Sequence, residues 1–436
     1  MTIPREGTNL DPWYGLYADR TAGLSASEVR ALFAVASRPE VVSLAGGMPF
    51  VKALPLERVT ASMERVMREQ GTRALQYGSG QGTPELREHI LEIMALEGVR
   101  AGVDDVVVTT GSQQALDLIA KLFLDSGDVV LAESPSYVGA MGIFRSYQAE
   151  VSHVAMDGDG MIPQALVERI QSLRSQGRDI KFLYLIPNFH HPAGVTLSWE
   201  RRLEIIEIAR REGILIVEDN PYGLLWFDRP APHAMRSVET DGIVYLGSFS
   251  KTLAPGFRIG WALAPHGIRE KLVLAAESAI LSPSVANELI VSDYLASTDW
   301  KGQIDTYRGL YRERRDAMID ALEHYLPDLH WTMPNGGFYV WVTLPEGLDS
   351  KGMLPRAVKE LVAYTPGTAF FADGSGRANL RLSYCYPTPA EIREGIRRLA
   401  GVVRGEQELL STFSPATAAE RIGAAPHVIS PPPNIG

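Results

Sequence analysis

Lys251 lies in the segment Gly247-Ser-Phe-Ser-Lys251-Thr-Leu-Ala-Pro-Gly-Phe-Arg258-Ile-Gly-Trp261, directly after the short apolar run Ile243–Leu246. An apolar run that ends in small residues is typical of a buried strand entering a loop. A lysine at such a strand end can be desolvated and can reach a bound carbonyl, as Schiff-base chemistry requires. Hydroxyl and guanidinium donors suited to a phosphate dianion accompany it: Ser248, Ser250 and Arg258. The alternative is a surface loop with a solvated lysine.

The chain around this segment alternates strands and helices. Helical periodicity covers Ser112–Leu124 and Trp199–Arg211. Short, nearly all-apolar runs occur at Val106–Thr109, Val129–Ala132, Phe182–Ile186, Ile214–Val217 and Ile243–Leu246. Runs of this kind indicate strands buried on both faces, so the sequence predicts an α/β fold with a mostly parallel sheet. Ligands of such sheets bind beyond the carboxyl ends of the strands.

Polar residues follow four of the other predicted strands. Ser112 and Gln113 open a helix after Gly111, where free backbone amides can bind an anion. Tyr137 follows the next strand and can stack on a planar ring, although a packing role is the alternative. Asn188 follows the strand ending at Ile186, and Asp219 ends a strand with Tyr222 three residues on. A buried aspartate can hold a pyridine nitrogen protonated, because opposite charges stabilise both ionised forms.

Size and composition exclude several classes of protein. With 436 residues the chain exceeds the size of a single core, so two domains are expected. A net charge of −10 argues against general nucleic-acid binding, and the single Cys385 excludes an internal disulfide framework and a cysteine-cluster metal site. No apolar run is long enough to cross a membrane and no signal peptide is visible, so we expect a cytoplasmic protein without a membrane partner.

The remaining segments give a provisional division of the chain. Strands are expected at Gly336–Thr343 and Asn379–Tyr384, and helices at Tyr307–Tyr325 and Pro389–Leu399. We predict an N-terminal arm and first helix (1–35), an N-terminal part of a small domain or linker (36–75), a large domain (76–305), a C-terminal small domain (306–410) and a mobile tail (411–436).

Taken together, these residues resemble a known family. The ordered set Tyr77, Gly111-Ser112-Gln113, Tyr137, Asn188, Pro192, Gly194, Asp219, Tyr222, Ser248, Ser250, Lys251, Arg258 and Arg381 is similar to the class I/II, fold-type I aminotransferases, which use pyridoxal 5′-phosphate (PLP). Val42–Gly47, Gln76-Tyr77 and Gly336–Trp341 resemble the branch with 2-aminoadipate and kynurenine aminotransferases. The resemblance implies a large domain with a mostly parallel seven-stranded sheet flanked by helices, and a smaller α+β domain from the N- and C-terminal segments.

The resemblance also implies roles for individual residues. Lys251 would form the aldimine with PLP and carry the proton, and Asp219 would pair with the pyridine nitrogen. Asn188 and Tyr222 would hydrogen-bond the phenolic oxygen of the ring, and Tyr137 would stack on it. The phosphate would be held by Ser112, Gln113, Ser248, Ser250 and Arg258, joined by Tyr77 from the second subunit of a homodimer.

For the substrate, the resemblance points to the C-terminal part and to the N-terminal helix. Arg381 would bind the α-carboxylate with help from the Gly47 backbone and Asn188, and Arg30 would meet a distal carboxylate. The implied reaction moves the amino group of an L-amino acid to a 2-oxo acid in amino acid metabolism or biosynthesis. The implied donor is an L-amino acid whose side chain is of the aminoadipate or glutamate type, aromatic or branched.

One departure from the family and two alternatives stay open. The family usually has a polar amide where this chain has His190-His191; a metal reading is disfavoured because adjacent side chains rarely share one ion. The first alternative is a PLP enzyme of a biosynthetic pathway on the same scaffold, such as a lyase, decarboxylase or cyclase. The second is an aminotransferase-like transcriptional regulator, against which the short N-terminal arm and the negative charge argue.

Overall fold

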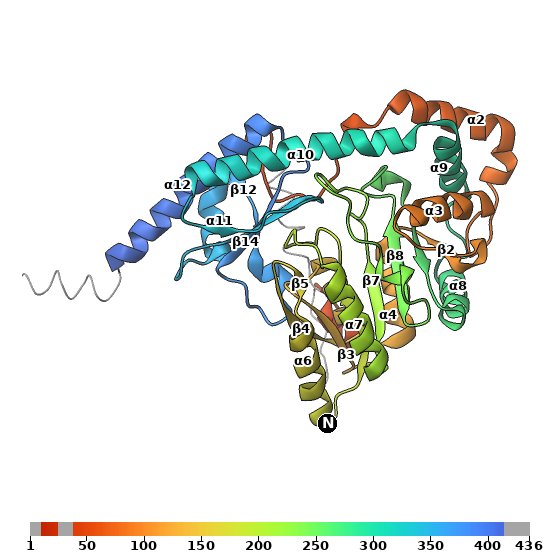
Figure 1. Ribbon diagram of the computed structural model, residues 1–436, viewed down its shortest axis with the longest axis horizontal. Helices are drawn as coiled ribbons and strands as arrows, with labels where there is room; N and C mark the ends of the chain where they lie inside the picture. Colours follow the sequence, from red (N-terminus) through yellow and green to blue (C-terminus); the bar gives the residue numbers. More distant parts are fainter. Residues whose placement is uncertain (1–9, 25–37, 414–436) are drawn as a thin grey trace, which may run out of the picture.

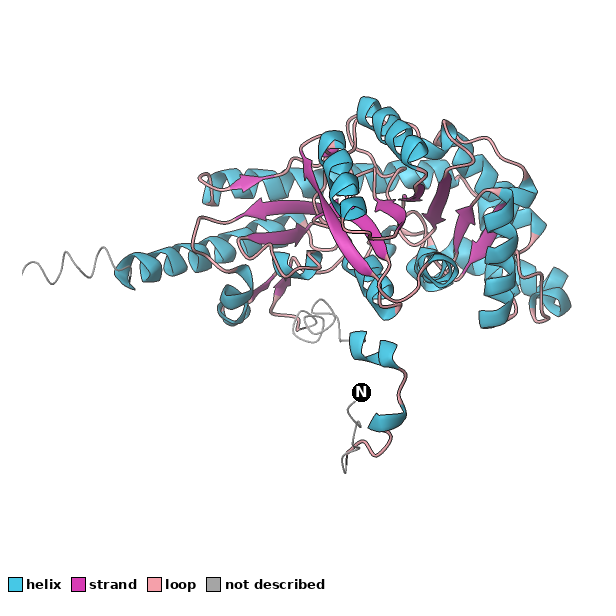
Figure 2. Ribbon diagram, turned by 90° about the horizontal axis from the view of Figure 1, so that it is seen from below, coloured by secondary structure: helices cyan, strands magenta, loops and turns pink. Residues whose placement is uncertain are grey.

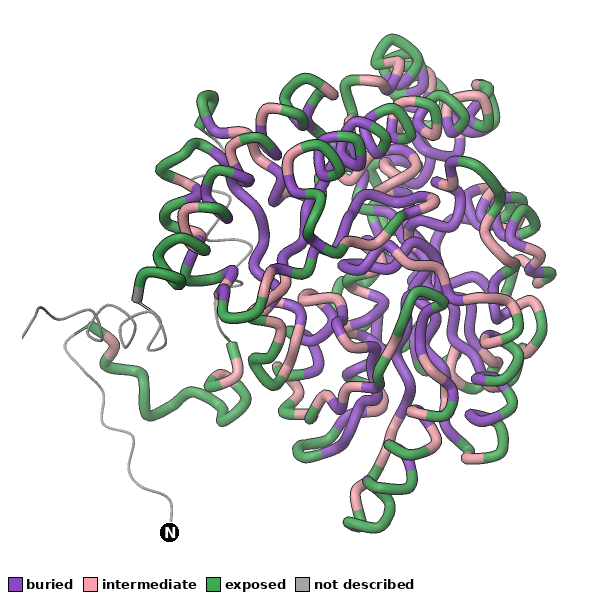
Figure 3. Tube along the Cα trace, turned by 60° about the vertical axis from the view of Figure 1, so that its left-hand side comes forward, coloured by how far each residue is buried: buried purple, intermediate pink, exposed green. Residues whose placement is uncertain are grey.

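The computed structural model describes residues 10–24 and 38–413, and its strands form three sheets of eight, four and two strands. The eight-stranded sheet and its helices fill one side of the molecule, the two small sheets lie with α12 (Pro389–Phe413) on the other side, and α10 (Trp300–Tyr325) runs across both (Figure 1). Strands form the buried centre, while the outer faces of the helices are exposed (Figure 3). No helix in these described ranges is long and apolar enough to cross a membrane.

The large sheet has the strand order β2-β9-β8-β7-β6-β3-β4-β5. Its strands are β2 (Val106–Thr109), β3 (Val129–Ser134), β4 (Glu150–Asp157), β5 (Gly160–Met161), β6 (Ile180–Leu185), β7 (Leu215–Asp219), β8 (Ile243–Ser248) and β9 (Gly260–Leu263). The five strands from β8 through β4 run parallel, whereas β9 is antiparallel to both β2 and β8. The expected mostly parallel α/β sheet is therefore present. The eighth strand is the two-residue β5, which pairs only with β4 and is too short to leave a sequence pattern.

Helices cover both faces of this sheet because neighbouring residues of each strand point to opposite sides. Val130 packs with α4, α5 and α8, whereas its neighbour Val129 packs with α6 and α7. The helices of this part are α2 (Leu56–Ala74), α3 (Pro84–Leu96), α4 (Ser112–Phe123), α5 (Val138–Ser146), α6 (Pro163–Ser175), α7 (Trp199–Glu212), α8 (His266–Ile280) and α9 (Val285–Ser297). α3 begins at Pro84. A proline is tolerated at the first helical position because the backbone N–H that it lacks would have no partner within the helix.

The C-terminal part combines two small sheets with long helices. The four-stranded sheet has the order β10-β11-β14-β13, and β1 pairs in parallel with β12. The elements are β1 (Val42–Ser43), α10 (Trp300–Tyr325), β10 (His330–Trp331), β11 (Tyr339–Thr343), α11 (Ser350–Lys359), β12 (Val362–Ala363), β13 (Thr365–Pro366), β14 (Asn379–Ser383) and α12 (Pro389–Phe413). α12 continues fourteen residues past the predicted end at Leu399 and through the start of the tail that we expected to be mobile.

Short 3-10 helices connect these elements. They are η1 (Tyr14–Leu16), η2 (Asp19–Gly23), η3 (Val51–Ala53), η4 (Val103–Asp105), η5 (Met235–Ser237), η6 (Pro255–Phe257) and η7 (Gly367–Phe370). η1 and η2 lie in the described N-terminal segment, which projects from the rest of the ribbon in Figure 2 but contacts α5 through η2. The predicted first helix, with Arg30, lies outside the described residues, as does most of the predicted tail.

Packing bears on the provisional division in two places. α10 crosses the division placed at residue 305: Trp300 and Ile304 pack with the core around α2, α3 and α9, whereas Tyr307 and the buried residues after it pack with the C-terminal sheet. α2 also packs on α9, so this stretch of 36–75 joins the core of the large part instead of the small one. The domain limits remain our proposal.

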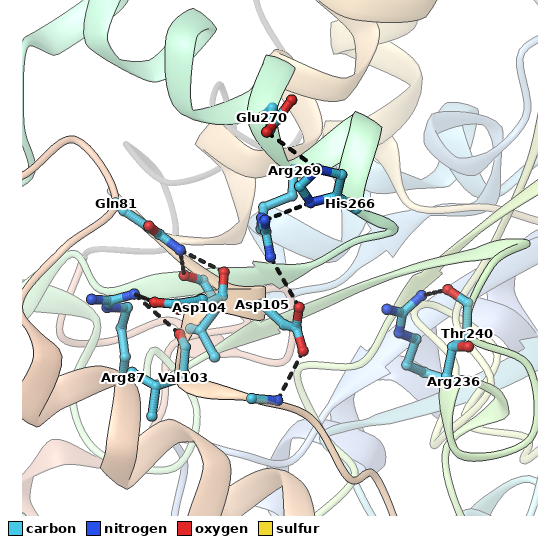
Figure 4. Close-up of polar contacts among 12 residues, drawn as sticks. Gln81, Arg87, Val103, Asp104, Asp105, Arg236, Thr240, His266, Arg269 and Glu270 are labelled. Carbon is cyan, nitrogen blue, oxygen red and sulfur yellow. Dashed lines mark hydrogen bonds and ion pairs between the residues drawn. The ribbon is translucent and has the colours of Figure 1, made fainter.

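The η4 turn and the start of the edge strand β2 are held by side chains from three directions (Figure 4). Arg87 of α3 donates to the carbonyl of Val103, and Arg269 of α8 donates to Asp105 at 3.1 Å. Gln81 donates to the carbonyls of Asp104 and Val106 at 2.7 and 3.0 Å. These contacts fix the strand that leads into the turn before α4, and that turn faces the cavity described below.

Gly260 offers a test of how this turn is placed. A Cβ atom at position 260 would lie 2.4 Å from the backbone nitrogen of Ser112 and 2.5 Å from the carbonyl carbon of Gly111. The backbone of Gly111 and Ser112 cannot move away without a cost in free energy. Gly260→Ala should therefore lower the free energy of unfolding by about 1–3 kcal/mol, the usual range for overpacking. Chemical denaturation of the purified protein measures this loss.

Gly309→Ala is the matched control, because Gly309 is exposed in the middle of α10 and a Cβ there meets no atom within 4 Å. This change should raise the free energy of unfolding by about 0.5–1 kcal/mol, as removal of a mid-helix glycine does. Equal effects of the two substitutions would show that the close approach of β9 to α4 is not a constraint.

Candidate active site

A cavity of about 750 Å³ lies beyond the carboxyl ends of β7 and β8, between the large sheet and the C-terminal part. Ten residues that were predicted from the sequence line it: Gly47, Ser112, Gln113, Tyr137, Asp219, Tyr222, Ser248, Ser250, Lys251 and Arg381. They come from positions 47 to 381, so the fold assembles one site from the loops that follow separate strands. This is the place where an open α/β sheet binds its ligands.

Lys251 follows β8 and extends into this cavity. Its Nζ donates to the carbonyl of Gly47 at 3.0 Å and lies 5.7 Å from the ring centre of Phe338. Burial lowers the pKa of Lys251, and the positive charge of Arg381 lowers it further. Both effects shift the equilibrium of Lys251 towards the neutral amine, which is the form that attacks a carbonyl or accepts a proton.

Asp219 is the last residue of β7 and is 3% exposed. Its Oδ2 accepts a hydrogen bond from the Tyr184 hydroxyl at 2.8 Å, while its buried Oδ1 has no partner among the described residues. Burial raises the pKa of Asp219 to about 6, against the lowering effect of the Tyr184 bond. A buried carboxylate oxygen without a partner fits a protonated pyridine nitrogen, which supplies both a hydrogen bond and an opposite charge.

The turn before α4 forms a cradle for an anion. Gly111 has a φ of +78°, and a Cβ there would lie 2.5 Å from Nη2 of Arg258, so the guanidinium rests against this turn. Ser112 begins α4, and the hydroxyls of Ser248 and Ser250 lie 2.9 Å apart on the neighbouring loop. Helix amides, two hydroxyls and a guanidinium are a donor set that fits the phosphate of PLP.

Two tyrosines predicted to contact the cofactor line the cavity. The Tyr137 hydroxyl donates to Gln113 at 3.2 Å, and its ring centre lies 5.1 Å from that of His191. The Tyr222 hydroxyl lies 3.5 Å from the hydroxyl of Tyr339. Burial raises the pKa of both predicted tyrosines, so both stay neutral and keep a proton to donate.

Arg381 on β14 is a buried cation, 2% exposed. It donates to the hydroxyl of Thr365 at 2.9 Å, to the carbonyl of Ala45 and to Nε2 of His191, and it lies 4.5 Å above the Tyr339 ring centre. No carboxylate in the described ranges pairs with it. An anion that enters the cavity, such as a substrate carboxylate, supplies the missing charge.

Asn188 does not line the cavity. It is 1% exposed, its Nδ2 donates to Asn220 at 3.0 Å, and its Oδ1 accepts from the buried guanidinium of Arg202. Arg202 needs acceptors because burial of an unpaired cation is costly. The position of Asn188 therefore does not fit the predicted contacts with cofactor and substrate, and His191, three residues further along, lines the cavity instead.

One other predicted residue, Tyr77, lies away from the cavity of this chain. Tyr77 is 77% exposed and lines no part of it, which leaves its predicted role in a second subunit as a prediction. Arg30 lies outside the described residues. The Gly47 carbonyl is used by Lys251, and a Cβ at Gly47 would collide with the Tyr339 hydroxyl.

The two adjacent histidines have separate partners. Nε2 of His190 lies 3.0 Å from the Glu133 carboxylate, and its Nδ1 accepts from the Ala193 amide at 3.3 Å. His191 faces Arg381 and the cavity instead. In the parts of the chain that the structure describes, no three His, Cys, Asp or Glu side chains are grouped as metal ligands are.

The sequence reasoning missed His191 and Tyr339 as cavity residues. Tyr339 lies in the segment Gly336–Trp341 that carried the family resemblance, but no separate signal marked its side chain. His191 was noticed only as a departure from the family pattern.

Known proteins share this fold and this sequence pattern. The sequence model of the family Aminotransferase class I and II matches residues 39–399. The aromatic-amino-acid aminotransferase 1 of Thermococcus litoralis is 40% identical over 90% of this chain and 95% of its own length. The 2-aminoadipate transaminase of Thermus thermophilus is 37% identical over 90% of this chain and 98% of its own. A crystal structure of Pyrococcus horikoshii kynurenine aminotransferase, in complex with PMP, superposes with a TM-score of 0.86 at 38% identity, covering 89% of this chain and 97% of the other.

Asp219 allows a direct test of the electrostatics of the site. Because its folded-state pKa is raised, ionising Asp219 costs stability, and this cost grows as the pH rises from about 4 to 6. In the protein without cofactor, Asp219→Asn should therefore raise the free energy of unfolding by on the order of 3 kcal/mol above pH 6, at about 1.4 kcal/mol per pKa unit. The gain should vanish below about pH 4, where the wild-type carboxyl is protonated in both states.

Denaturant titrations at a series of pH values measure this difference. Asp320→Asn, a change at an exposed position on α10, is the control and should leave the stability unchanged throughout. A gain for Asp219→Asn that is independent of pH would mean that the effect is one of packing and not of charge.

Proposed function

The chain belongs to the aminotransferase class I and II family and is a PLP-dependent transaminase of fold type I, and on that basis we propose how its own residues carry the reaction. Lys251 is the lysine that bonds to the cofactor, Asp219 holds the pyridine nitrogen protonated, and Arg381 binds the substrate carboxylate. The observation that carries the proposal is the cavity itself, which brings together three groups: a lysine with a lowered pKa, a carboxylate oxygen with no partner among the described residues, and a buried guanidinium that no described carboxylate pairs with.

Each residue has a task that follows from its surroundings. Bound PLP supplies an acceptor for the electrons released at the substrate Cα. Asp219 would keep a proton on the ring nitrogen, because its charge is buried and no described residue bonds its Oδ1. Ser112, Gln113, Ser248, Ser250 and Arg258 anchor the phosphate.

Lys251 moves the proton in this proposal. Its lowered pKa favours the neutral amine, so Nζ of Lys251 would act as the base that accepts the proton of the substrate Cα. Tyr222 and Tyr137 stay neutral and keep hydroxyl donors beside it. His191 lies where the family pattern led us to expect an amide.

The proposed substrate class is argued from the residues that line the cavity and from the names of the relatives. Leu24, Val138 and Ile143 provide apolar surface, and Arg145 on α5 provides a guanidinium that pairs with no described carboxylate. Relatives are named for aromatic amino acids and for 2-aminoadipate. We therefore propose L-amino donors with aromatic, branched or aminoadipate- and glutamate-like side chains, and a 2-oxo acid as acceptor, in cytoplasmic amino acid biosynthesis. The relatives at 37–40% identity are named aminotransferases, which does not favour the lyase, decarboxylase, cyclase or regulator alternatives.

We further propose that the enzyme is a homodimer in which Tyr77 contacts the phosphate bound by the partner. Leu75, Tyr77 and Leu281 are 75%, 77% and 61% exposed and lie on adjacent segments, since the Gly78 amide donates to Ser282 at 3.3 Å. Leu281 also has a φ of +63°, which is unfavourable for a leucine. An exposed apolar patch with a strained backbone is more easily explained by burial against a second copy than by contact with water.

Chemical labelling can identify the lysine that bonds to the cofactor. Borohydride reduction of the loaded enzyme should fix the cofactor on Lys251, and peptide mapping should find no other labelled lysine. Lys251→Arg should abolish labelling and transamination while the protein keeps its fold by circular dichroism. Labelling of Lys121 or of any other lysine would refute the assignment.

The proposed dimer can be tested at Leu281. Leu281→Glu should shift the protein towards monomer in sedimentation experiments and weaken the retention of PLP, because the partner's Tyr77 is then lost from the phosphate site. Met333→Glu is the control, since Met333 is 60% exposed but lies in the C-terminal part. Dimers of unchanged stability in Leu281→Glu would place the interface elsewhere.

A further inference from the structure

His191 lies on the loop after β6 and packs against the cavity. It is 7% exposed, and its ring is stacked on Tyr339 with 4.3 Å between ring centres and an angle of 16°. Tyr137 and Phe370 surround the ring at 5.1 and 5.7 Å. The imidazole is therefore held in one orientation by aromatic neighbours on several sides.

The contact with Arg381 fixes the tautomer of this ring. Nη1 of Arg381 lies 2.6 Å from Nε2 of His191. A guanidinium only donates hydrogen bonds, so Nε2 must be the unprotonated acceptor and Nδ1 must carry the proton. No described residue accepts from Nδ1, and the ring lines the cavity, so this N–H is available to a bound molecule.

The charges around His191 keep the imidazole neutral. Burial lowers the pKa of His191 well below its usual value, and the charges of Arg381, Lys251 and His190 lower it further. The remaining neighbours, Tyr137 and Tyr339, are neutral phenols with raised pKa values. The acceptor at Nε2 therefore persists across the physiological pH range.

Arg381 depends on this acceptor for its orientation. Three of its five N–H donors are taken by the Ala45 carbonyl, the Thr365 hydroxyl and His191. The first two both use Nη2, so His191 is the one described partner of Nη1. Without it the guanidinium is held at one end only.

We propose that His191 is a positioning residue of the substrate-carboxylate site: its neutral ring holds Nη1 of Arg381 through Nε2 and offers Nδ1–H to the bound carboxylate or to the cofactor oxygen beside it. The inference rests on the proposed role of Arg381. It assigns to His191 the place that the sequence had given to Asn188, with an imidazole in place of an amide.

Binding of an unreactive carboxylate to the PLP-loaded enzyme tests the proposal. The probe is 3-phenylpropanoate, titrated calorimetrically into wild type, His191→Phe, His191→Gln and Arg381→Lys from about pH 6 to pH 9. Phenylalanine keeps the stack on Tyr339 but has no acceptor, so the Kd should rise by about 10- to 100-fold, the range for a hydrogen bond to a charged group. Glutamine carries an acceptor and a donor and should bind within about threefold of wild type.

His153→Phe is the matched control, because it removes a partly buried histidine that bonds the Glu133 carbonyl and the Ala372 amide but lines no part of the cavity. It should leave the Kd unchanged. The pH dependence of binding should be the same in wild type and in His191→Phe, because a neutral positioning ring does not titrate in this range.

The outcomes separate this inference from the function on which it rests. Unchanged affinity in His191→Phe, with a large loss in Arg381→Lys, overturns the role of His191 alone. Unchanged affinity in Arg381→Lys overturns the proposed carboxylate site. A pH-dependent limb that disappears in His191→Phe shows a titrating histidine and also overturns the inference. If His191→Phe does not fold, His191→Met, which fills the space without a strong acceptor, replaces it in every comparison.

Discussion

The site depends on one costly arrangement, a carboxylate buried at the carboxyl end of β7. Asp219 is held there by the strand, and Tyr184 satisfies only one of its two oxygens. Burial alone would leave the group protonated over much of the acidic range, since its pKa is raised to about 6. A protonated pyridine nitrogen beside Asp219 offsets the free-energy cost of burying the ionised carboxylate. The buried carboxylate therefore favours binding of a protonated pyridine.

The rest of the cavity places basic side chains around that single carboxyl group. Lys251 and Arg381 are in the cavity wall, and Arg258 lies against the turn before α4. A phosphate dianion and a substrate carboxylate bring the anions that these groups lack. Burial lowers the pKa of both Lys251 and His191, and the charge of Arg381 beside them lowers it further. The basic groups that lack an anionic partner in the protein are therefore the same groups that bind the phosphate and the substrate carboxylate in the proposed function.

Strand ends could be predicted from the sequence, whereas the direction of a side chain within a loop could not. Ser112, Asp219 and Lys251 each lie at the junction of a strand and a loop or helix, and such junctions leave a pattern of apolar runs followed by polar residues. Asn188 and His191 share one loop, and the positive φ of Phe189 between them turns the backbone so that only the second faces the cavity. The need of Arg202 for acceptors, which draws Asn188 away, is a contact between distant segments that no local pattern records.

The protonation state of the pyridine nitrogen in the loaded enzyme tests the central claim most directly. Nuclear magnetic resonance of the holoenzyme prepared with PLP labelled with nitrogen-15 in the ring reports this state through the chemical shift of the nitrogen. The account predicts the shift of a protonated pyridinium throughout the range from about pH 6 to pH 9, because Oδ1 of Asp219 has no other partner in the part of the chain that the structure describes. The shift of a neutral pyridine over that range would contradict it.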